Sequence, residues 1–411
     1  MTDDRSADTA TARLAVRVTP DAGRHVRHGH PWVFDDSVLS VRPDGVAGDL
    51  AVIFDDRRRF MGIGLYDPDS PIRIKILHRG DPTPIDRPFW VERLEQALRR
   101  RATLVDDPGT TAFRWVHGEN DALPGLVLDR YGTATVAKVY SAAWLPHLDD
   151  VLAAAQQVLP AETVVLRLAR NVPPGSSGGD GAVLLGAAPT GPVRFLERGL
   201  TFEADLVHGQ KTGHFLDQRD NRARVRARAR GARVLDVYSC TGGFSVNAAA
   251  GGAELVHSVD ISTGAIATAR RNMDHNRSLP AVRECHHHDT VGDAMAVMAE
   301  MADHGRRFDM VVVDPPSFAS RKDQVEGALR AYRRLTQLAL RLLEPGGQLV
   351  QASCSSRVTE HDFVVAVESA ARDSGVVLGG AVCMGHAIDH PVGFAEGAYL
   401  KAMFATVETA R

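Results

Sequence analysis

Apolar residues in the C-terminal half of the chain alternate between two patterns. Short apolar runs, typical of buried strands, are followed by longer segments in which apolar residues recur every three or four positions, typical of amphipathic helices. The predicted strands are Val234–Val237, Leu255–Val259, Phe308–Val313 and Gln348–Ala352, and the predicted helices are Phe244–Ala250, Thr263–Asn276 and Ala328–Leu343. Strands that alternate with helices up to about residue 375 require a parallel sheet, so an α/β fold is predicted for residues 196–411.

The preceding residues follow other patterns, which predict two further domains. Over residues 13–80, β-type runs such as LAVIF and IRIKIL lie between the turn sequences VRPDG and DPDSP, which predicts a small β-rich domain. Residues 81–195 combine predicted helices at Phe89–Leu104 and Leu145–Leu159 with predicted strands. They are expected to form a small α+β middle domain.

The composition narrows the class of protein. A chain of 411 residues is too long for one typical core and is expected to form two or three domains. The formal net charge of −3 gives no global electrostatic basis for binding nucleic acid, so any RNA site must be a local patch. The polar, acidic residues 1–12 are predicted to be a disordered tail and not a signal peptide, and no apolar run has the length of a membrane span. Four cysteines without a CxxC pair indicate a reducing, cytoplasmic environment.

The stretch from Ala232 to Asp260 is predicted to be a strand–turn–helix–strand unit, as in nucleotide-binding open sheets. Its turn, SCTGGF, lacks the GxGxxG fingerprint of dinucleotide sites, and Asp236 at the end of the first strand would repel a pyrophosphate. An acid there suits an ammonium, and Asp260 is placed to accept hydrogen bonds from ribose hydroxyls. S-adenosylmethionine (SAM) carries an amino-acid tail, a ribose and no phosphate. The unit therefore favours a SAM-dependent methyltransferase over a nicotinamide enzyme or a unit without a ligand.

Further residues are predicted to contact this cofactor. They are Ser239, Thr241 and Gly242 in the turn, Ile261 after the second strand, and Lys211, Gln218 and Arg219 in the polar segment before the central strand. That segment could fold over the site because it directly precedes the cofactor strand. Asp293 stands at the start of a predicted helix, where it could cap the helix or meet the adenine amino group.

Two other polar clusters are interpreted as structural. The sequence CHHHD at 285–289 has no pair of ligands at a zinc-like spacing, so no metal is predicted. Glu119, Asp121 and Asp129 suggest acid–base chemistry, but they surround the turn sequence NDALPG, where carboxylates commonly cap backbone amides.

Two more strand ends carry reactive side chains, DPPSF at 314–318 and SCSS at 353–356. Pro315 and Pro316 restrict the backbone, so that Asp314 is held toward the pocket. Phe318 offers a flat surface for a base that has been taken out of its stack. A strand followed by DPP and an aromatic residue is typical of nucleobase methylation.

Cys354 selects the chemistry. Carbon 5 of a pyrimidine is a poor nucleophile, but a thiolate that adds to carbon 6 makes carbon 5 able to accept a methyl group. A thiol of ordinary pKa is only about 3% thiolate at pH 7, and Asp314, if protonated, could assist by donating to the ring. The alternative is that Cys354 is a small buried residue in a strand–helix turn.

Basic residues near the N-terminus indicate a local surface for phosphate contacts. Arg24 and Arg27 precede GHPWVF, and Arg73 lies with Lys75 and Arg79 along a predicted strand. The segments GRHVRHGHPWVF and GIGLYDPDSPIRIKIL resemble a PUA domain, a small RNA-binding pseudo-barrel. Arg24, Arg27 and Arg73 are therefore predicted to contact the substrate.

Seven motifs occur together and in order: FLDQRDNR, VLDVYSCTGGFSVNAAAGGA, VDIS, FDMVVVDPPSFA, SCSS, DHPV and EGAYLKAM. They resemble the large-subunit ribosomal RNA methyltransferase I family, which forms 5-methylcytosine in bacterial 23S rRNA. The resemblance covers nearly the whole chain. It implies a PUA domain, a middle domain and a class I SAM methyltransferase domain with a Rossmann-like, seven-stranded, mostly parallel sheet. By this similarity Cys354 is the nucleophile, Asp314 is its partner at the base, and SAM is held by Asp236, Gly242, Asp260 and Asp293.

The resemblance implies 23S rRNA or a large-subunit assembly intermediate as the partner, with no membrane. A homodimer is compatible with the sequence, but nothing requires one. The base that removes the carbon 5 proton stays unassigned. Two alternatives remain, a methyltransferase of the same fold that acts on a guanine nitrogen without covalent help, and an RNA-binding assembly factor with a vestigial SAM pocket. The intact acids Asp236, Asp260 and Asp314 argue against the second.

Overall fold

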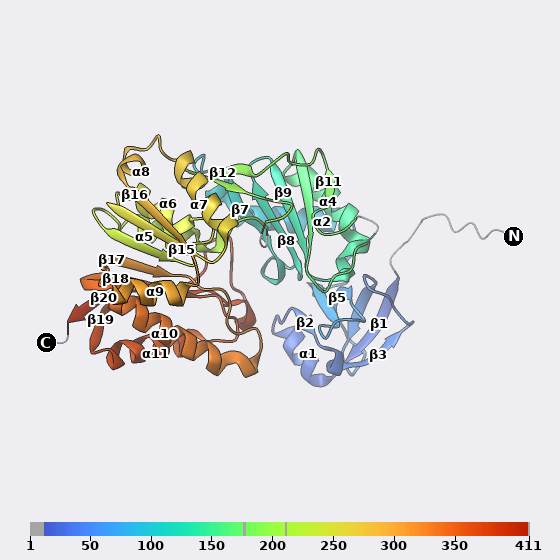
Figure 1. Cartoon of the computed structure of the whole chain (residues 1–411). Helices are drawn as coiled ribbons and strands as arrows, with labels where there is room; N and C mark the ends of the chain where they lie inside the picture. The colour runs from blue at the N-terminus through green and yellow to red at the C-terminus, as the bar shows by residue number, and fades with distance from the viewer. Residues whose placement is uncertain (1–11, 176–177, 210–211, 410–411) are drawn as a thin grey trace. The chain divides into compact units, whose positions relative to one another are not determined.

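The computed structural model describes residues 12–175, 178–209 and 212–409, and they form two compact units (Figure 1). The N-terminal unit comprises the residues up to Asp107, Ala112–Val193 and Asp205–Gly213. The C-terminal unit comprises Pro108–Thr111, Arg194–Ala204 and the residues from His214 onward. The predicted tail lies outside the described residues except for Ala12. The chain passes between the two units five times, so each unit is assembled from segments that are distant in sequence.

A six-stranded sheet forms the first part of the N-terminal unit, with the strand order β2-β6-β5-β4-β1-β3. Its strands are β1 (Arg13–Val18), β2 (Trp32–Val33), β3 (Val38–Arg42), β4 (Leu50–Phe54), β5 (Phe60–Tyr66) and β6 (Ile74–Arg79), with helix α1 (Pro20–Arg27) and the 3-10 turn η1 (Asp35–Ser37). Leu14, Val16 and Val18 are buried and alternate along β1 with exposed or half-buried residues, which is the two-residue period of a strand with one face on a core. The β-rich fold predicted for this stretch is confirmed.

A second, five-stranded sheet in the same unit has the order β11-β10-β9-β8-β7. Its elements are β7 (Ala112–His117), β8 (Leu126–Tyr131), β9 (Ala134–Val139), β10 (Thr163–Leu168) and β11 (Val183–Leu185), with α2 (Arg87–Arg99), α3 (Ala102–Val105), α4 (Leu148–Val158), η2 (Gly118–Asp121) and η3 (Ala142–His147). Helices α2 and α4 pack against each other over a core that contains Trp90, Trp115 and Trp144. Leu65 and Leu77 of the first sheet belong to the same core, so the two sheets of this unit share apolar packing.

The C-terminal unit contains a seven-stranded sheet with the order β16-β15-β14-β17-β18-β20-β19. Its strands are β14 (Arg233–Val237), β15 (Leu255–Asp260), β16 (His286–Val291), β17 (Phe308–Val313), β18 (Leu343–Ser353), β19 (Val376–Met384) and β20 (Lys401–Thr409). The first five strands in this order run parallel, and β20 runs antiparallel to both of its neighbours, β18 and β19. The predicted α/β class with a mostly parallel, seven-stranded sheet is confirmed. A separate two-stranded sheet pairs β12 (Val193–Glu197) with β13 (Leu200–Ala204).

Helices cover both faces of this sheet (Figure 1). They are α5 (Arg219–Arg226), α6 (Gly243–Ala250), α7 (Thr263–His275), α8 (Pro280–Glu284), α9 (Ala294–Asp303), α10 (Val325–Leu342) and α11 (Glu360–Asp373), with the short turns η4 (Leu216–Gln218), η5 (Lys322–Gln324) and η6 (Ala395–Gly397). Helix α5 packs against α6, and α10 packs against α9 and α11. Strand residues such as Leu235, Val311 and Leu349 are fully buried, because helices on both sides leave neither face of the central strands to solvent.

The long helix predicted over Phe89–Leu104 is divided in the structure, because Arg101 turns inward. Its side chain is fully buried, and two of its nitrogens bind the two carboxylate oxygens of Asp121 at 2.8 and 2.7 Å. Asp121 also accepts the backbone N–H of His117 at 2.7 Å, as the capping interpretation requires. The two other carboxylates of this group bind side chains, Glu119 the indole of Trp32 and Asp129 the guanidinium of Arg114.

Replacement of Asp121 by asparagine is expected to destabilise the protein by about 3–5 kcal/mol, because the buried charge of Arg101 loses its counterion. Calorimetric unfolding should show a loss of melting temperature on the order of 10 °C. The control is Asp150→Asn, which removes the exposed ion pair with Arg87 and is expected to change the melting temperature very little. Equal effects of the two variants would contradict a structural role for Asp121.

Candidate functional site

Three chemically active side chains lie at one edge of the central sheet. Asp236 is near the end of β14, Asp314 directly follows β17, and Cys354 directly follows β18. These three strands are parallel neighbours, with Asp236 paired to Val312 and Val313 paired to Gln351. Their carboxyl ends therefore meet at the same edge, where open α/β sheets bind ligands.

Asp314 is held by the polar segment that precedes the central strand. The amide of Gln218 donates from Nε2 to Oδ1 of Asp314 at 3.0 Å. Asn221, one turn later in α5, donates to Oε1 of Gln218 at 2.6 Å, which fixes the orientation of the Gln218 amide. Gln218 and Asn221 are both buried, so this chain of hydrogen bonds is shielded from solvent. Gln218 was predicted to contact the cofactor; in the structure it binds Asp314, and its cofactor contact stays a prediction.

Cys354 lies in a turn that is tied to the DPPSF loop. Its thiol donates to the carbonyl oxygen of Pro315, with 3.7 Å between sulfur and oxygen. The next residue, Ser355, accepts the backbone N–H of Phe318 at 3.0 Å and binds the hydroxyl of Tyr332 at 2.9 Å. These contacts bring the two loops, which are about forty residues apart in the chain, into one rigid arrangement.

The buried side chain of Lys401 also binds the turn that follows Cys354. Nζ of Lys401, the first residue of β20, donates to the carbonyl oxygens of Ser355 and Val358 at 2.8 and 2.7 Å. Burial lowers the pKa of Lys401 to about 8, while a negative charge at Cys354 acts in the opposite direction and raises it. The same attraction favours a thiolate at Cys354 when Lys401 is charged. Lys401 is the lysine of the EGAYLKAM motif, and its contact with the Cys354 turn was not predicted from the sequence.

Pro315 is buried, whereas Pro316 is exposed. The ring of Phe318 is half-buried, and its centroid lies 5.2 Å from that of Tyr332. Phe318 is therefore supported on one side by a second aromatic ring and retains exposed surface beside Cys354. This position is compatible with the predicted contact between Phe318 and a base.

Asp236 is fully buried, and its Oδ2 accepts the hydroxyl of Ser245 at 2.6 Å. Burial raises the pKa of Asp236 to about 7, because desolvation disfavours the charged carboxylate. Its other oxygen, Oδ1, has no hydrogen-bond partner among the described residues, and the buried hydroxyl of Ser239 also lacks one there. Buried polar atoms without partners are costly, so these two fit a ligand that supplies hydrogen-bond donors, such as an ammonium.

The turn after β14 is conformationally constrained. Tyr238, Cys240 and Gly242 all have positive φ, at 62°, 48° and 76°. A side-chain carbon on Gly242 would lie 2.8 Å from Cβ of Ala269 in α7. The lack of a side chain at Gly242 therefore accommodates a packed helix, and its predicted contact with the cofactor stays a prediction. The carbonyl of Thr241 in the same turn accepts the amide of Asn272, also on α7.

Asp260 ends β15 and organises the adjacent turns. Its two carboxylate oxygens accept the backbone N–H groups of Cys240 at 2.9 Å and of Ser262 at 2.8 Å. A carboxylate has further acceptor capacity, so these bonds leave room for the predicted ribose contact. Ile261 is 73% exposed, an unusual position for a large apolar side chain next to a strand end, and it is available to pack against a ligand. Asp293 caps α9 by accepting the N–H of Ala296 at 2.9 Å, as one of its two interpretations predicted.

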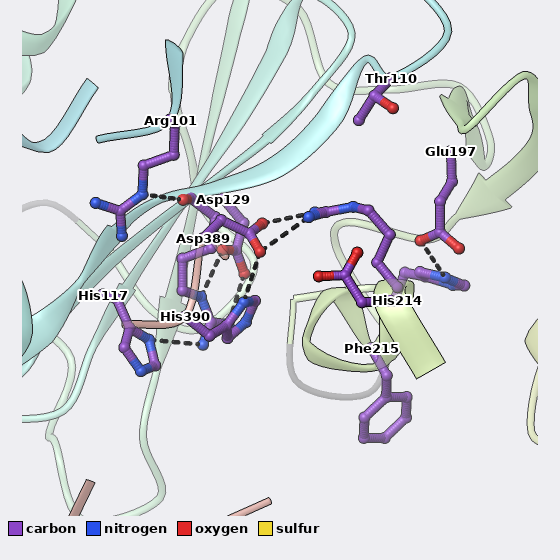
Figure 2. A network of polar contacts seen from close by, with 12 residues as sticks. Arg101, Thr110, His117, Asp129, Glu197, His214, Phe215, Asp389 and His390 are labelled. Atoms are coloured by element: carbon purple, nitrogen blue, oxygen red, sulfur yellow. Dashed lines mark hydrogen bonds and ion pairs between the residues drawn. The ribbon is translucent and has the colours of Figure 1, made fainter. Parts of the chain in front are cut away.

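Arg219 is fully buried in an ion pair with Asp389, which was not predicted from the sequence. Its two terminal nitrogens bind the two carboxylate oxygens of Asp389 at 2.9 and 2.6 Å. Asp389 also contacts His390, and Glu197 lies beside His214 (Figure 2). Glu197 also accepts a hydrogen bond from Arg222 at 2.7 Å. The positive charge of Arg219 is thus balanced within the unit, and its predicted cofactor contact stays a prediction. Lys211, the third residue predicted in this segment, lies outside the described residues.

The basic residues of the N-terminal sheet differ in their environments. Arg24 is exposed and pairs with Asp21, and Arg27 lies 3.7 Å from the carboxylate of Asp55. Arg73 donates to the carbonyl oxygen of Pro68. The expectation that Lys75 belongs to a basic surface is wrong, because Lys75 is buried.

A carboxylate explains why that lysine is inside. Nζ of Lys75 binds Asp67 at 3.0 Å, and burial lowers the pKa of Lys75. The hydroxyl of Ser141, the N-cap residue of η3, donates to the same carboxylate at 2.5 Å. Asp67 therefore links Lys75 of β6 to the start of η3, and Lys75 contributes no charge to the surface.

The His-rich strand forms β16, where His287 binds the hydroxyl of Ser258 and Asp289 pairs with Arg270. Among the described residues, no cluster of three or more His, Cys, Asp or Glu side chains could hold a metal ion. Within the same residues, no helix combines the length and the apolar character that crossing a membrane requires.

Comparison with known proteins agrees with this geometry. A family model described as S-adenosylmethionine-dependent methyltransferase matches residues 175–380, and one described as a PUA-like domain matches residues 16–79. The crystal structure of the methyltransferase SMU.776 in complex with S-adenosylhomocysteine (SAH) has the same fold, with a TM-score of 0.81 and 22% identity over 97% of this chain and 100% of that one. The fold and the acidic strand edge define a SAM-dependent methyltransferase preceded by a PUA-like domain, and SAM is its cofactor.

Relatives of nearly full length identify the family. The ribosomal RNA large subunit methyltransferase of Deinococcus radiodurans is 45% identical over 97% of this chain and 99% of its own length. The ribosomal RNA large subunit methyltransferase I of Pseudoalteromonas translucida is 32% identical over 96% of this chain and 99% of its own. The chain belongs to the large-subunit ribosomal RNA methyltransferase family, which confirms the resemblance seen in its motifs.

Because the pKa of Asp236 lies near 7, its charge should control cofactor affinity around neutral pH. If its carboxylate binds the ammonium of the cofactor, affinity for SAH should rise about tenfold as the pH rises from 6 to 8, since the deprotonated fraction increases by that factor. Titration calorimetry at several pH values measures this.

The Asp236→Asn variant serves as the control, because it retains the titration of the ligand itself and removes that of the carboxyl group. Its affinity should be low and nearly constant between pH 6 and 8. A variant with the same pH profile as the wild type would exclude Asp236 from the cofactor site.

Proposed function

We propose that the protein transfers the methyl group of SAM to carbon 5 of a cytosine in large-subunit ribosomal RNA, through a covalent adduct between Cys354 and carbon 6 of the base. The observation that carries this proposal is the contact between Sγ of Cys354 and the DPP turn, 3.7 Å from the carbonyl of Pro315. This contact supports the proposal because the thiol of Cys354 then lies at the same strand edge as Asp314 and Asp236. The choice of RNA rests on the names of the relatives.

The proposed reaction uses the thiolate of Cys354 as the nucleophile. The new bond from sulfur to carbon 6 moves an electron pair of the ring toward carbon 5, which then attacks an electrophilic carbon. Asp314, in its protonated form, donates a hydrogen bond to the ring as negative charge develops there. Bound SAM supplies the electrophilic methyl group. Removal of the carbon 5 proton by a base that is not yet assigned then breaks the bond from sulfur to carbon 6 and frees Cys354.

The surrounding contacts support these roles. Gln218 and Asn221 hold Asp314 in one orientation, and Ser355 holds the two reactive loops together. The buried ammonium of Lys401 is attracted to a thiolate at Cys354, which favours the reactive form of the cysteine. Phe318 retains exposed surface, on which a base taken out of its stack can lie.

The test is transfer of labelled methyl from SAM to protein-free 23S rRNA, followed by nucleoside mass spectrometry. Cys354→Ala is expected to lower the rate at least about 1,000-fold, because it removes the nucleophile. Cys285→Ala is the matched control, since Cys285 lies at the end of α8 and its activity should be unchanged. SAH affinity of the Cys354 variant should equal that of the wild type.

The identity of the product separates the alternatives. Label in 5-methylcytosine that disappears in Cys354→Ala supports the covalent mechanism. Label in a methylguanosine that persists in the variant would show that a guanine nitrogen is the target and would overturn the proposed chemistry.

A further inference from the structure

We infer that the C-terminal unit carries a second contact with the RNA, a groove in which Arg224 and Arg228 bind the phosphate backbone. This inference rests on the proposed function, because it assumes an RNA substrate. The groove lies between α5 and the antiparallel strands β19 and β20, apart from the reactive loops. We call it the α5 groove.

The α5 groove consists of two adjoining hollows with volumes of about 160 and 380 Å³. They share three lining residues, Arg224, Arg228 and Met384, so they are parts of one depression. The first hollow is otherwise lined by Gln348, Gly380, Val382, Phe404, Ala405 and Thr406, and the second by Arg198, Asp220, Asn221, Ala223, Ala227, Gly385 and His386.

The charge of the α5 groove is positive. Asp220 is its only carboxylate among these lining residues, and it is neutralised by Arg198 at 2.6 Å. Arg224 and Arg228 have no carboxylate within ion-pair distance in the part of the chain that the structure describes. The whole chain has a net charge of −3, so two uncompensated guanidinium groups in a hollow are a local exception of the kind an RNA contact requires.

The geometry of Arg228 suits a phosphate. Its guanidinium lies over the ring of Phe404, 5.7 Å from the centroid, which is a favourable cation–π contact. One nitrogen donates to the carbonyl of Arg224 at 3.1 Å, as is common near a helix C-terminus. A guanidinium has five N–H donors, so this contact leaves others for a phosphate oxygen. Gln348 and His386 add further polar groups to the lining of the groove.

The α5 groove is also connected to the catalytic edge. Asn221 lines the second hollow and donates to Gln218, which in turn donates to Asp314. Two hydrogen bonds therefore join the groove wall to the residue proposed to act on the base. An RNA strand held in the groove would be anchored beside the segment that orients Asp314.

The experiment measures the affinity for protein-free 23S rRNA between 50 and 200 mM salt, for the wild type and for the double variant Arg224→Gln/Arg228→Gln. Each lost phosphate contact should reduce the slope of log affinity against log salt by about 0.7. For two contacts, the factor by which the affinity falls between 50 and 200 mM salt should be about seven times smaller for the double variant than for the wild type. SAH affinity and melting temperature should not change, and each single variant should lose half of the slope difference.

The matched control is Arg306→Gln/Arg307→Gln, which removes the same charge from two exposed arginines that precede β17 and do not line the groove. Its salt dependence should equal that of the wild type. Equal slopes for the double variant and the wild type would overturn the inference and leave the proposed function intact. A wild type that does not bind the RNA at all would overturn both, so the two failures are distinguishable.

Discussion

One turn of chain, from Asp217 to Arg222, carries the constraint on which the site depends. Asp217 accepts the hydroxyl of Tyr399, Gln218 binds Asp314, Arg219 binds Asp389, and Arg222 binds Glu197. Four side chains within six residues thus fix four segments that are distant in sequence. Charge-assisted, bidentate contacts of arginine with carboxylate have strict geometry, so the two buried ion pairs define position as well as balancing charge. The orientation of Asp314 follows from the way this turn is held.

Asp236 and Asp260 are both aspartates at the ends of neighbouring strands, but their surroundings give them different properties. Asp236 is fully buried beside one hydroxyl, and the pKa of its carboxyl group is raised to about 7. Asp260 accepts two backbone N–H groups in the turns around it and has a structural role besides the predicted ribose contact. The sequence indicates an acid at the end of each strand, but the number of hydrogen bonds that each acid accepts depends on the folded turns.

Sequence patterns predict those features that depend on neighbouring residues. The strands of the central sheet follow from their apolar runs, the cap of α9 from Asp293, and the strand-edge position of Asp314 and Cys354 from the parallel order of the strands. Contacts between distant charged residues could not be predicted in this way, because an arginine in a polar segment has the same pattern whether it is solvated or buried. Arg219 with Asp389 and Arg222 with Glu197 are such cases. The partner in each pair is selected by the fold and leaves no local signal.

The repeated passage of the chain between its two units has a consequence for the evolution of this architecture. Pro108–Thr111 belongs to the C-terminal unit, and Thr111 exchanges hydrogen bonds with Leu196 through both its backbone N–H and its hydroxyl. Asp205–Gly213, which directly follows β13, belongs to the N-terminal unit. Genetic recombination at a single point in the chain would therefore separate at least one unit from a segment that belongs to it. The PUA-like and methyltransferase parts of this chain are therefore expected to be inherited together, as one gene, and not exchanged as separate modules.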